Sequence, residues 1–280
     1  MRTVVSIVSP GVMGASIAAR LVGHGIEVRT SVEGRGRATA ERAAAAGMTA
    51  VSADALLEAD ILLSIVPPGV AVSTAKAIAG HYAGASHRPL YIDCNAVNVE
   101  TAKEIAGIIT DAGGDFADGS IIGMPAREGY AGPAIFVSGD HAKRAAVLAE
   151  YGLQIRVMDA PVGAASALKM AYGGITKGLI ALGSAMILGA SRADVAGALK
   201  DEMSRSQQTL LAGFSKSIPD MFPKASRWVA EMEEISRFLG PDTPQGRMFA
   251  EIAAFYTHLA SADGRQDIAS LASFFETPAN

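Results

Sequence analysis

The sequence predicts an α/β fold, with a doubly wound and mostly parallel sheet, followed by an all-α C-terminal domain. Up to about residue 160, short β-branched runs alternate with Ala-rich helical segments, the pattern of parallel strands joined by right-handed crossover helices. After Pro161 no strand-like run follows, and helical periodicity dominates. We therefore expect two domains, residues 1–160 and residues 161–280.

The strands are expected at short apolar runs, whose continuous apolar character fits a sheet covered on both faces. These runs are residues 3–8, 27–30, 60–66, 90–93, 115–118, 134–137 and 155–158. Helices are expected between them at residues 13–24, 36–46, 70–79 and 99–112. The second domain is expected to contain helices at residues 164–188, 192–207, 226–239 and 244–259. Thr243 is the expected N-cap of the last helix, with Pro244 at its first position.

The composition excludes several classes of protein. Hydrophobic residues make up 50% of the chain and charged residues 19%, so a buried core is expected and disorder is excluded as the main state. A net charge of −4 is too weak and too mixed in sign for an electrostatic nucleic-acid binder. The single cysteine excludes a disulfide scaffold, and the five scattered histidines show no ligand spacing, so we predict no metal site.

Neither an export signal nor a membrane span is expected. The apolar run at residues 3–8 is broken by Ser9, Pro10 and Gly11 before it reaches the length of a signal segment. The most apolar later stretch, residues 173–190, contains Lys177, which would be costly inside a membrane. We interpret it as a buried core or interface helix, and expect a cytoplasmic protein that binds neither membrane nor nucleic acid.

A glycine-rich turn follows the first expected strand and takes the place of the dinucleotide fingerprint G-x-G-x-x-G. Gly11 takes the position at which the backbone approaches a diphosphate, Gly14 the position at which helix packs close to strand, and Ser9 replaces the first glycine. The amides and dipole of the following helix would hold the diphosphate. We predict a Rossmann-type domain that binds a dinucleotide through Ser9, Pro10, Gly11, Val12, Met13 and Gly14. The alternative is a similar turn that binds another ligand or none.

The end of the second expected strand bears on which cofactor is bound. Ser31 and Arg35, together with Arg37, would suit the 2′-phosphate of NADP, because a guanidinium binds phosphate in a bidentate manner. Glu33 argues against NADP, since an acidic side chain here favours binding to the ribose hydroxyl of NAD. Alternatively, both arginines are solvated at the start of the next helix. We expect NADP as the cofactor, with NAD possible.

Five segments in order resemble motifs of the β-hydroxyacid dehydrogenase superfamily, the group of 3-hydroxyisobutyrate and 6-phosphogluconate dehydrogenases. They are GVMG at 11–14, SIVPP at 64–68, IDCNAV at 92–97, FADGSIIG at 116–123 and GAASALK at 163–169. The chain is most similar to a subgroup that has a helical C-terminal domain of unassigned function. The resemblance implies a dinucleotide-binding first domain, and a second domain for substrate binding and dimerisation.

The same resemblance implies the residues around the reacting groups. It places the cofactor against Val66, Pro67, Pro68 and Asn95, and the substrate against Asn95, Ser120, Gly123 and position 173. The chain departs from the family at Gly173, where an asparagine is usual, and at Ile122 and Met124, which replace a hydroxyl residue and a glycine. These lost polar groups argue against a small polar hydroxyacid. Thr176, two turns after Lys169, is a further candidate for substrate binding, although a bond to its own helix backbone is as plausible.

Lys169 is the candidate general acid/base. Hydride transfer between an alcohol and nicotinamide needs a group that manages the hydroxyl proton, and Lys169 lies in an apolar helical segment behind the small residues Gly163, Ala164 and Ala165. The resemblance gives this lysine the same role. The alternative is a surface lysine whose stem covers apolar neighbours.

These observations predict an oxidoreductase that transfers a hydride between NADP(H) and a 3-hydroxy acid or a related alcohol or aldehyde. Two alternatives remain open: an imine reductase, and a non-catalytic NADP-binding paralogue. We also expect a homodimer formed through the helical domain. By resemblance, Glu231, Met232 or Tyr256 would line the active site of the partner.

Overall fold

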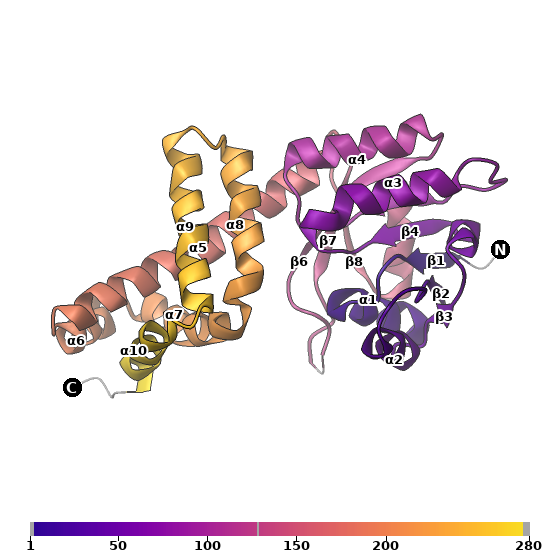
Figure 1. Ribbon diagram of the computed structural model, residues 1–280. Helices are drawn as coiled ribbons and strands as arrows, with labels where there is room; N and C mark the ends of the chain where they lie inside the picture. The colour runs from indigo at the N-terminus through magenta and orange to yellow at the C-terminus, as the bar shows by residue number, and fades with distance from the viewer. Residues whose placement is uncertain (1–2, 128, 277–280) are drawn as a thin grey trace. The chain divides into compact units, whose positions relative to one another are not determined.

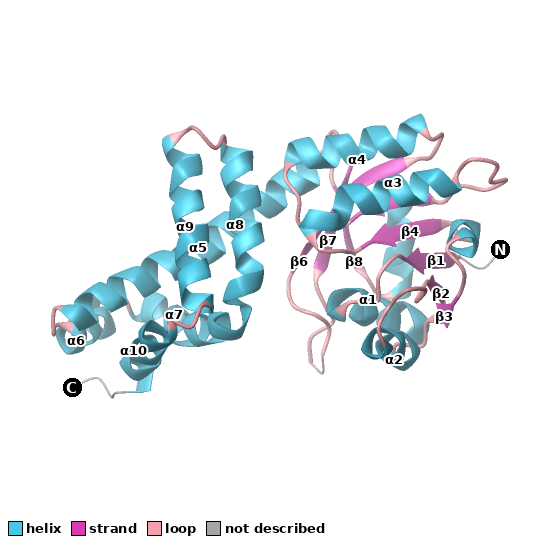
Figure 2. Ribbon diagram, viewed as in Figure 1, coloured by secondary structure: helices cyan, strands magenta, loops and turns pink. Residues whose placement is uncertain are grey.

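The computed structural model describes residues 3–127 and 129–276 (Figure 1). The chain forms two compact units, Met1–Met170 and Ala171–Asn280. Every strand lies in the first unit, while the second is helical (Figure 2). The boundary between the units falls inside the helix that begins at Ala164, later in the chain than the predicted domain boundary.

The first unit contains one sheet with the strand order β3-β2-β1-β4-β5-β6-β7-β8. Neighbouring strands are parallel except β6 and β7. The strands are β1 (Val4–Ile7), β2 (Glu27–Thr30), β3 (Thr49–Ala50), β4 (Ile61–Ser64), β5 (Leu90–Asp93), β6 (Phe116–Ile122), β7 (Ala134–Ser138) and β8 (Gln154–Val157). The order reverses between β1 and β4, the position at which open α/β sheets bind ligands beyond the carboxyl ends of their strands. The predicted fold class is confirmed.

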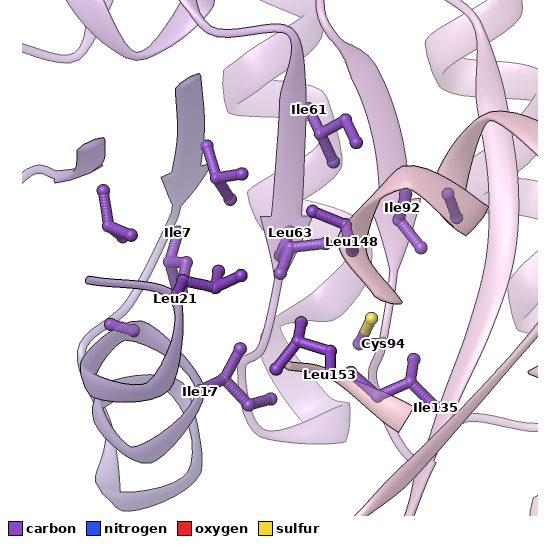
Figure 3. Packing of buried hydrophobic residues seen from close by; sticks show 14 of the residues in the cluster. Ile7, Ile17, Leu21, Ile61, Leu63, Ile92, Cys94, Ile135, Leu148 and Leu153 are labelled. Atoms are coloured by element: carbon purple, nitrogen blue, oxygen red, sulfur yellow. The ribbon is translucent and has the colours of Figure 1, made fainter. Parts of the chain in front are cut away.

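Helices cover both faces of the sheet (Figure 1). One face carries α1 (Val12–Gly23), α2 (Arg37–Ala45) and the 3-10 segment η3 (Ala142–Tyr151), which pack on β1, β4 and β5 through a core shown in Figure 3. The other face carries α3 (Ala71–His81) and α4 (Val99–Asp111), whose Ile78, Ile105 and Ile109 pack against Leu62 and Tyr91. Two shorter 3-10 segments are η1 (Asp54–Glu58) and η2 (Pro68–Val70). In β4 and β5, apolar residues alternate between these two cores, so these central strands read as continuous apolar runs in the sequence.

The predicted strand at residues 115–118 is too short, because β6 continues to Ile122. Gly119 directly follows the predicted end of the strand, but it does not end β6. A Cβ at Gly119 would lie 2.8 Å from the carbonyl oxygen of Asp93 and 3.0 Å from Sγ of Cys94. Glycine therefore permits a close approach between β5 and β6 and leaves the strand intact.

The second unit contains most of α5 (Ala164–Arg192), then α6 (Ala196–Ser206), α7 (Gln208–Met221), η4 (Phe222–Lys224), α8 (Ala225–Leu239), α9 (Pro244–Ala260) and α10 (Arg265–Glu276). Thr243 caps α9 as predicted, accepting a hydrogen bond from Gly246 N at 3.0 Å. Neither α7 nor α10 is predicted by the sequence patterns. Pro219 lies inside α7 and reads as a break, although a Pro near a helix end removes only a late hydrogen bond.

Helix α5 is long and apolar enough to cross a membrane, judged by length and composition alone, and 39% of its most apolar window is buried within the protein. The charge inside it is paired, since Lys177 Nζ donates to Glu231 Oε2 of α8, and both side chains are less than one-fifth exposed. A Cβ added at Gly174 or at Gly178 would lie 3.3 Å from the Phe249 ring of α9. These contacts bury one side of α5, which fits the core or interface helix expected from the sequence.

Candidate cofactor and active site

The turn between β1 and α1 has the geometry that the glycine pattern predicts. Gly11 is the N-cap of α1 and has an extended backbone (φ −64°, ψ 177°). As a glycine it provides no side-chain cap for the N–H groups of the first turn. A Cβ at Gly11 would meet no atom within 4 Å, whereas a Cβ at Gly14 would lie 2.6 Å from the Ser9 carbonyl oxygen. Gly14 therefore permits close packing of helix on strand, and the open space at Gly11 fits a diphosphate held by the helix amides.

A contact that the sequence patterns did not indicate supports this turn. Arg42 of α2 donates from Nη1 to the carbonyl oxygen of Pro10 at 3.2 Å. Val12, the first residue of α1, is 66% exposed, and Ser9, Gly11 and Met13 are partly exposed. Only a three-dimensional fold brings residue 42 next to residue 10, so no spacing rule would have found Arg42.

The end of β2 holds the residues predicted to select the cofactor. Ser31 is partly buried and accepts from Glu33 N at 3.4 Å, while Arg35 is exposed. Arg37 lies in α2 and pairs with Glu41 at 2.6 Å.

Asn95 fixes the loop between β4 and η2. Its Oδ1 accepts from Val66 N at 2.6 Å, and its Nδ2 donates to Ser64 Oγ at 3.0 Å. The side chain is 3% exposed. Asn95 thus shapes the segment from Val66 through Pro67 and Pro68, which the resemblance places against the cofactor. Its predicted direct contact with cofactor or substrate stays a prediction.

The end of β6 and the residues after it, 120–124, contain the predicted substrate residues Ser120 and Gly123, and we call them the substrate segment. Gly123 has φ +129°, and a Cβ there would lie 2.6 Å from the Tyr130 hydroxyl oxygen, so only glycine fits without strain. Ser120 is fully buried, and its hydroxyl has no hydrogen-bond partner among the residues that the structure describes. Met124 is 47% exposed beside Gly123.

Lys169 lies one turn into α5 and reaches the sheet. Its Nζ donates to the carbonyl oxygen of Ile121, near the carboxyl end of β6. The residue is half-buried. The ammonium is therefore bound to the strand that carries the substrate segment, which is not the arrangement of a lysine extended over an outer surface.

Asp118, the last residue of the strand predicted at 115–118, binds the start of α5. Its Oδ2 accepts from Gly163 N at 2.9 Å, Ser166 N at 3.0 Å and Ser138 Oγ at 3.1 Å. Its Oδ1 accepts from Ser166 Oγ at 2.7 Å. Burial raises the pKa of Asp118, and the hydrogen bonds from Ser166, Ser138 and Gly163 oppose that rise. An aspartate inside an apolar strand was the signal that could have identified it.

Asp93 is the register partner of Asp118 on the adjacent strand. It is 1% exposed, and burial, followed by the negative charge of Asp118, raises its pKa to about 7 against hydrogen bonding from Asn95. Its Oδ1 accepts from Asn95 N at 2.8 Å. Its Oδ2 has no hydrogen-bond partner in the described part of the chain. Two carboxyl groups thus lie side by side within the protein.

The remaining predicted residues belong to the second unit. Thr176 Oγ1 donates to the Tyr172 carbonyl oxygen at 2.9 Å, which is the alternative considered for it. Gly173 does not interrupt α5, and a Cβ there would lie 3.8 Å from Ile235. Glu231 binds Lys177, and the Tyr256 hydroxyl donates to the Lys177 carbonyl oxygen at 2.7 Å. Glu231 and Tyr256 are thus engaged within their own unit.

Known proteins with this fold include dehydrogenases. An uncharacterized 28.5 kDa protein of Methanothermus fervidus is 28% identical over 217 residues, which cover 76% of this chain and 82% of that protein. The structure of the conserved protein MTH1747, of unknown function and described as similar to 3-hydroxyacid dehydrogenases, is 28% identical with a TM-score of 0.73, covering 91% of this chain and 97% of that one. 3-Hydroxyisobutyrate dehydrogenase of Mycobacterium tuberculosis, solved with L-serine, shares the fold at 21% identity and a TM-score of 0.74, covering 98% and 99%. An imine reductase of Myxococcus stipitatus, solved with NADP⁺, shares it at 20% identity and a TM-score of 0.54, covering 97% and 99%.

Two family models match the chain. A domain of unknown function, DUF1932, matches residues 190–259 in the helical unit. The NAD-binding domain of 6-phosphogluconate dehydrogenase matches residues 5–158, more than half of the chain and nearly all of the sheet. These residues include the turn at Gly11 and Gly14, Asn95 and the carboxyl end of β6. The chain therefore belongs to the family of the NAD-binding domain of 6-phosphogluconate dehydrogenase.

Proposed function

We propose that this protein is an NADP-dependent oxidoreductase that transfers a hydride between NADP(H) and a 3-hydroxy acid or a related alcohol or aldehyde, with Lys169 as general acid/base. The observation that carries the proposal is the bond from the Lys169 ammonium to the Ile121 carbonyl. Strands β1, β4, β5 and β6 are parallel, so their carboxyl ends lie at one edge of the sheet. The glycine turn, Asn95 and the Lys169 ammonium all follow or reach that edge.

Different residues of the chain would bind the cofactor and transfer the proton. The amides of the first turn of α1 would hold the diphosphate, and Ser31 with Arg35 would hold the 2′-phosphate. A bound nicotinamide cofactor supplies or accepts the hydride. Lys169 donates a proton to the substrate oxygen when a carbonyl is reduced, and takes the hydroxyl proton when an alcohol is oxidised. The Ile121 carbonyl would hold the Lys169 ammonium at the carboxyl end of β6, where the substrate would bind.

The substrate segment favours a less polar or larger substrate than 3-hydroxyisobutyrate. Ile122 and Met124 offer no hydrogen-bond donor from their side chains, and Met124 is exposed. Gly173 removes the amide that relatives of this group place one turn after the lysine. We therefore expect a 3-hydroxy acid or aldehyde with an apolar substituent.

The decisive experiment measures the affinity for NADPH and NADH, then screens hydroxyacids, aldehydes and cyclic imines for a change in NADPH absorbance. Lys169→Ala is expected to keep NADPH affinity and lose at least 100-fold in kcat, while Lys169→Arg, which keeps the charge but is a poor base, loses nearly as much. Near wild-type turnover in Lys169→Ala would refute the role of the lysine. Turnover of cyclic imines but not hydroxyacids would make it an imine reductase. Tight NADPH binding with no turnover of any compound would make it a non-catalytic paralogue.

The proposal extends to assembly as a homodimer through the helical unit. Along α5, the apolar side chains of Tyr172, Ile175, Leu179, Leu182 and Met186 are exposed, Ile175 by 72%. They recur at alternating spacings of three and four, the seam that one helix presents to another. The seam borders a groove of about 750 Å³ that α5 shares with Phe249 and Ile252 of α9. A second copy offers the same seam and is the occupant that we propose.

We place the protein in the cytoplasm as part of the same proposal. The nicotinamide cofactor that it would use is regenerated by metabolism inside the cell. Its single cysteine, Cys94, is a buried free thiol, and burial raises the pKa of that thiol. Such a thiol behaves as a small core residue.

A further inference from the structure

Four polar side chains form a continuous line across the sheet. Ser64 is the register partner of Asp93, Asp93 of Asp118, and Asp118 of Ser138, on strands β4, β5, β6 and β7. Each is at most 1% exposed. We call these four residues the polar row. They share the sheet face of Leu62, Tyr91 and Phe116, which packs against α3 and α4.

The polar row ends at the first turn of α5. The N–H groups at the start of a helix have no partner within the helix, and here three backbone N–H groups bind the row. Gly163 N and Ser166 N donate to Asp118, and Ala165 N donates to Ser138 Oγ at 3.0 Å. The negative carboxylate also interacts favourably with the positive end of the helix dipole. These donors favour the charged form of the buried carboxylate and hold the turn against Asp118.

Strand β6 holds the helix at two points. Asp118 binds the turn at Ser166, and three residues further along β6 the Ile121 carbonyl binds Lys169, three residues further along α5. The position of the Lys169 ammonium therefore depends on the seat of the turn that precedes it. Any shift of Ser166 away from Asp118 moves Lys169 relative to the end of β6.

Asp93 differs from Asp118 in its partners. Asp118 accepts hydrogen bonds at both carboxyl oxygens. Asp93 accepts one at Oδ1, from Asn95 N, and its buried Oδ2 has no partner among residues 3–127 and 129–276. The titratable neighbours of Asp93 along the chain are Tyr91 on β5 and Cys94 directly after it. Burial raises the pKa of both, so both are uncharged near neutrality. On β6 the neighbour is Asp118 itself. Two adjacent buried carboxylates repel, so the proton resides on Asp93.

We infer that Asp118 is a positioning residue for Lys169, and that a proton on Asp93 is required for Asp118 to keep its charge and hold α5 in place. The inference rests on the proposed function only for its kinetic consequence. When Asp93 loses its proton, two negative charges face each other, the hold on the first turn of α5 weakens, and Lys169 is less well placed. Both carboxyl groups are buried and act through the position of α5, without a role in contacting the substrate.

The first test separates position from chemistry by a readout that needs no turnover. In the unliganded protein, the rate at which acetic anhydride acylates Lys169 is measured by peptide mass spectrometry between pH 6 and 10, with Lys177 as internal reference. Asp118→Asn and Ser166→Ala are expected to change the Lys169 rate at least threefold and leave the Lys177 rate unchanged. Ser184→Ala is the matched control, because Ser184 is a buried serine with an unpartnered hydroxyl in the described helices and lies outside the polar row.

The second test uses the substrate found by the screen. Asp118→Asn is expected to lower kcat at least tenfold with unchanged NADPH affinity, and Ser166→Ala to lower kcat by a smaller factor in the same way. Asp93→Asn copies the protonated acid, so the fall of kcat above neutral pH is expected to move upward by at least one pH unit. If Asp118→Asn does not fold, Ser166→Ala and Ser138→Ala decide, since each keeps the carboxylate and removes one donor.

The outcomes are distinguishable from failure of the proposed function. Unchanged acylation of Lys169 in Asp118→Asn, or in both serine variants, overturns the positioning role even if Lys169→Ala is inactive. An unshifted pH profile in Asp93→Asn overturns the requirement for the proton. Full activity of Lys169→Ala would refute the proposed function and leave the acylation test valid.

Discussion

The ammonium of Lys169 donates a hydrogen bond to the backbone carbonyl of Ile121. A residue of the long helix is thereby bound to the strand that leads into the segment at Gly123. The two residues are 48 positions apart in sequence. The same strand and helix are also joined by two hydrogen bonds from Ser166 to Asp118, three residues earlier on each element.

Alanine substitutions at the two glycines of the cofactor turn are expected to affect different properties, stability at Gly14 and cofactor affinity at Gly11. Gly14→Ala would force a Cβ against the Ser9 carbonyl oxygen, at 2.6 Å, and is expected to lower the free energy of unfolding by about 3 kcal/mol. Gly11→Ala has space for its Cβ, so its stability should stay within about 1 kcal/mol of wild type. Its NADPH affinity should nevertheless fall at least tenfold, because the methyl group occupies the space of the diphosphate. Thermal unfolding and fluorescence titration measure the two effects. Unaltered NADPH binding in a folded Gly11→Ala protein would contradict the site.

The choice between NADP and NAD is expected to depend on Arg35. Replacing Arg35 by Ala removes a charge-assisted contact to the 2′-phosphate, so NADPH affinity should fall about tenfold while NADH affinity is unchanged. Arg37→Ala is the matched control, because Arg37 is engaged by Glu41. Isothermal titration with both cofactors compares the variants. Equal losses for NADPH and NADH, or a larger loss in Arg37→Ala, would count against the assignment.

The exposed seam on α5 is expected to hold two copies together. Leu182→Glu places a charge in the centre of the seam, and the protein should become monomeric at micromolar concentration. Val195→Glu serves as the control, because Val195 is 50% exposed, similar to the 59% of Leu182, but lies beyond the end of α5. Light scattering coupled to gel filtration gives the mass of each. A wild-type monomer, or a dimer that tolerates both substitutions, is incompatible with this interface.

Stability is expected to depend on pH through Asp93. Its pKa is about 7 in the folded protein against an ordinary value of 3.8, so the folded state retains a proton that the unfolded chain has lost. The free energy of unfolding therefore decreases as pH rises from about 4 to about 7, by a contribution of about 4 kcal/mol. Asp93→Asn lacks this contribution. Urea unfolding at pH 5, 6, 7 and 8 should show the stability difference between variant and wild type changing in the variant's favour, and a difference constant with pH would exclude the effect.

The pair formed by Lys177 and Glu231 is expected to be costly to break. Both side chains are less than one-fifth exposed, and Lys177 also lies 5.4 Å from the centre of the Trp228 ring. Removing one partner leaves a poorly solvated charge, so Glu231→Ala should lose about 3 kcal/mol. Replacing both, with Lys177→Met and Glu231→Leu, should restore most of that loss. The exposed pair of Lys103 and Glu100 is the comparison, for which Glu100→Ala should cost less than about 1 kcal/mol. Chemical denaturation of these variants measures their free energies of unfolding. Equal losses in Glu231→Ala and Glu100→Ala would show that the buried pair contributes no more to stability than the exposed one.

Much of the fold follows from local patterns. The alternation of strand and helix and the cap at Thr243 depend on neighbours in sequence, and the sheet and the α9 cap agree with them. The division between the two units falls at Met170, inside α5, where the apolar helical pattern is continuous and gives no local signal. The sequence patterns missed the full length of β6 and the strand β3, because the local residues there do not indicate a strand. Gly119 reads as a strand end, but its close approach to Asp93 is a property of two strands. The two residues of β3 are too few to form a periodic signal.

The candidate site was less accessible to such reasoning. The glycines and Lys169 belong to motifs and could be named in advance, whereas Arg42, Ser138 and Asp118 act through contacts between distant segments. Ser166 is polar within an apolar helix start, which gave no reason to pair it with a strand aspartate. Long-range hydrogen bonds such as these depend on register, and register is not visible in one sequence.

Asn95 bridges a backbone N–H on one side and the Ser64 hydroxyl on the other. A serine or threonine there would be too short to reach both, so positions 64 and 95 form a matched set. In an alignment of relatives they should covary, with an amide at 95 accompanying a small hydroxyl at 64. That pairing would provide a sequence marker for the branch of the family to which this chain belongs.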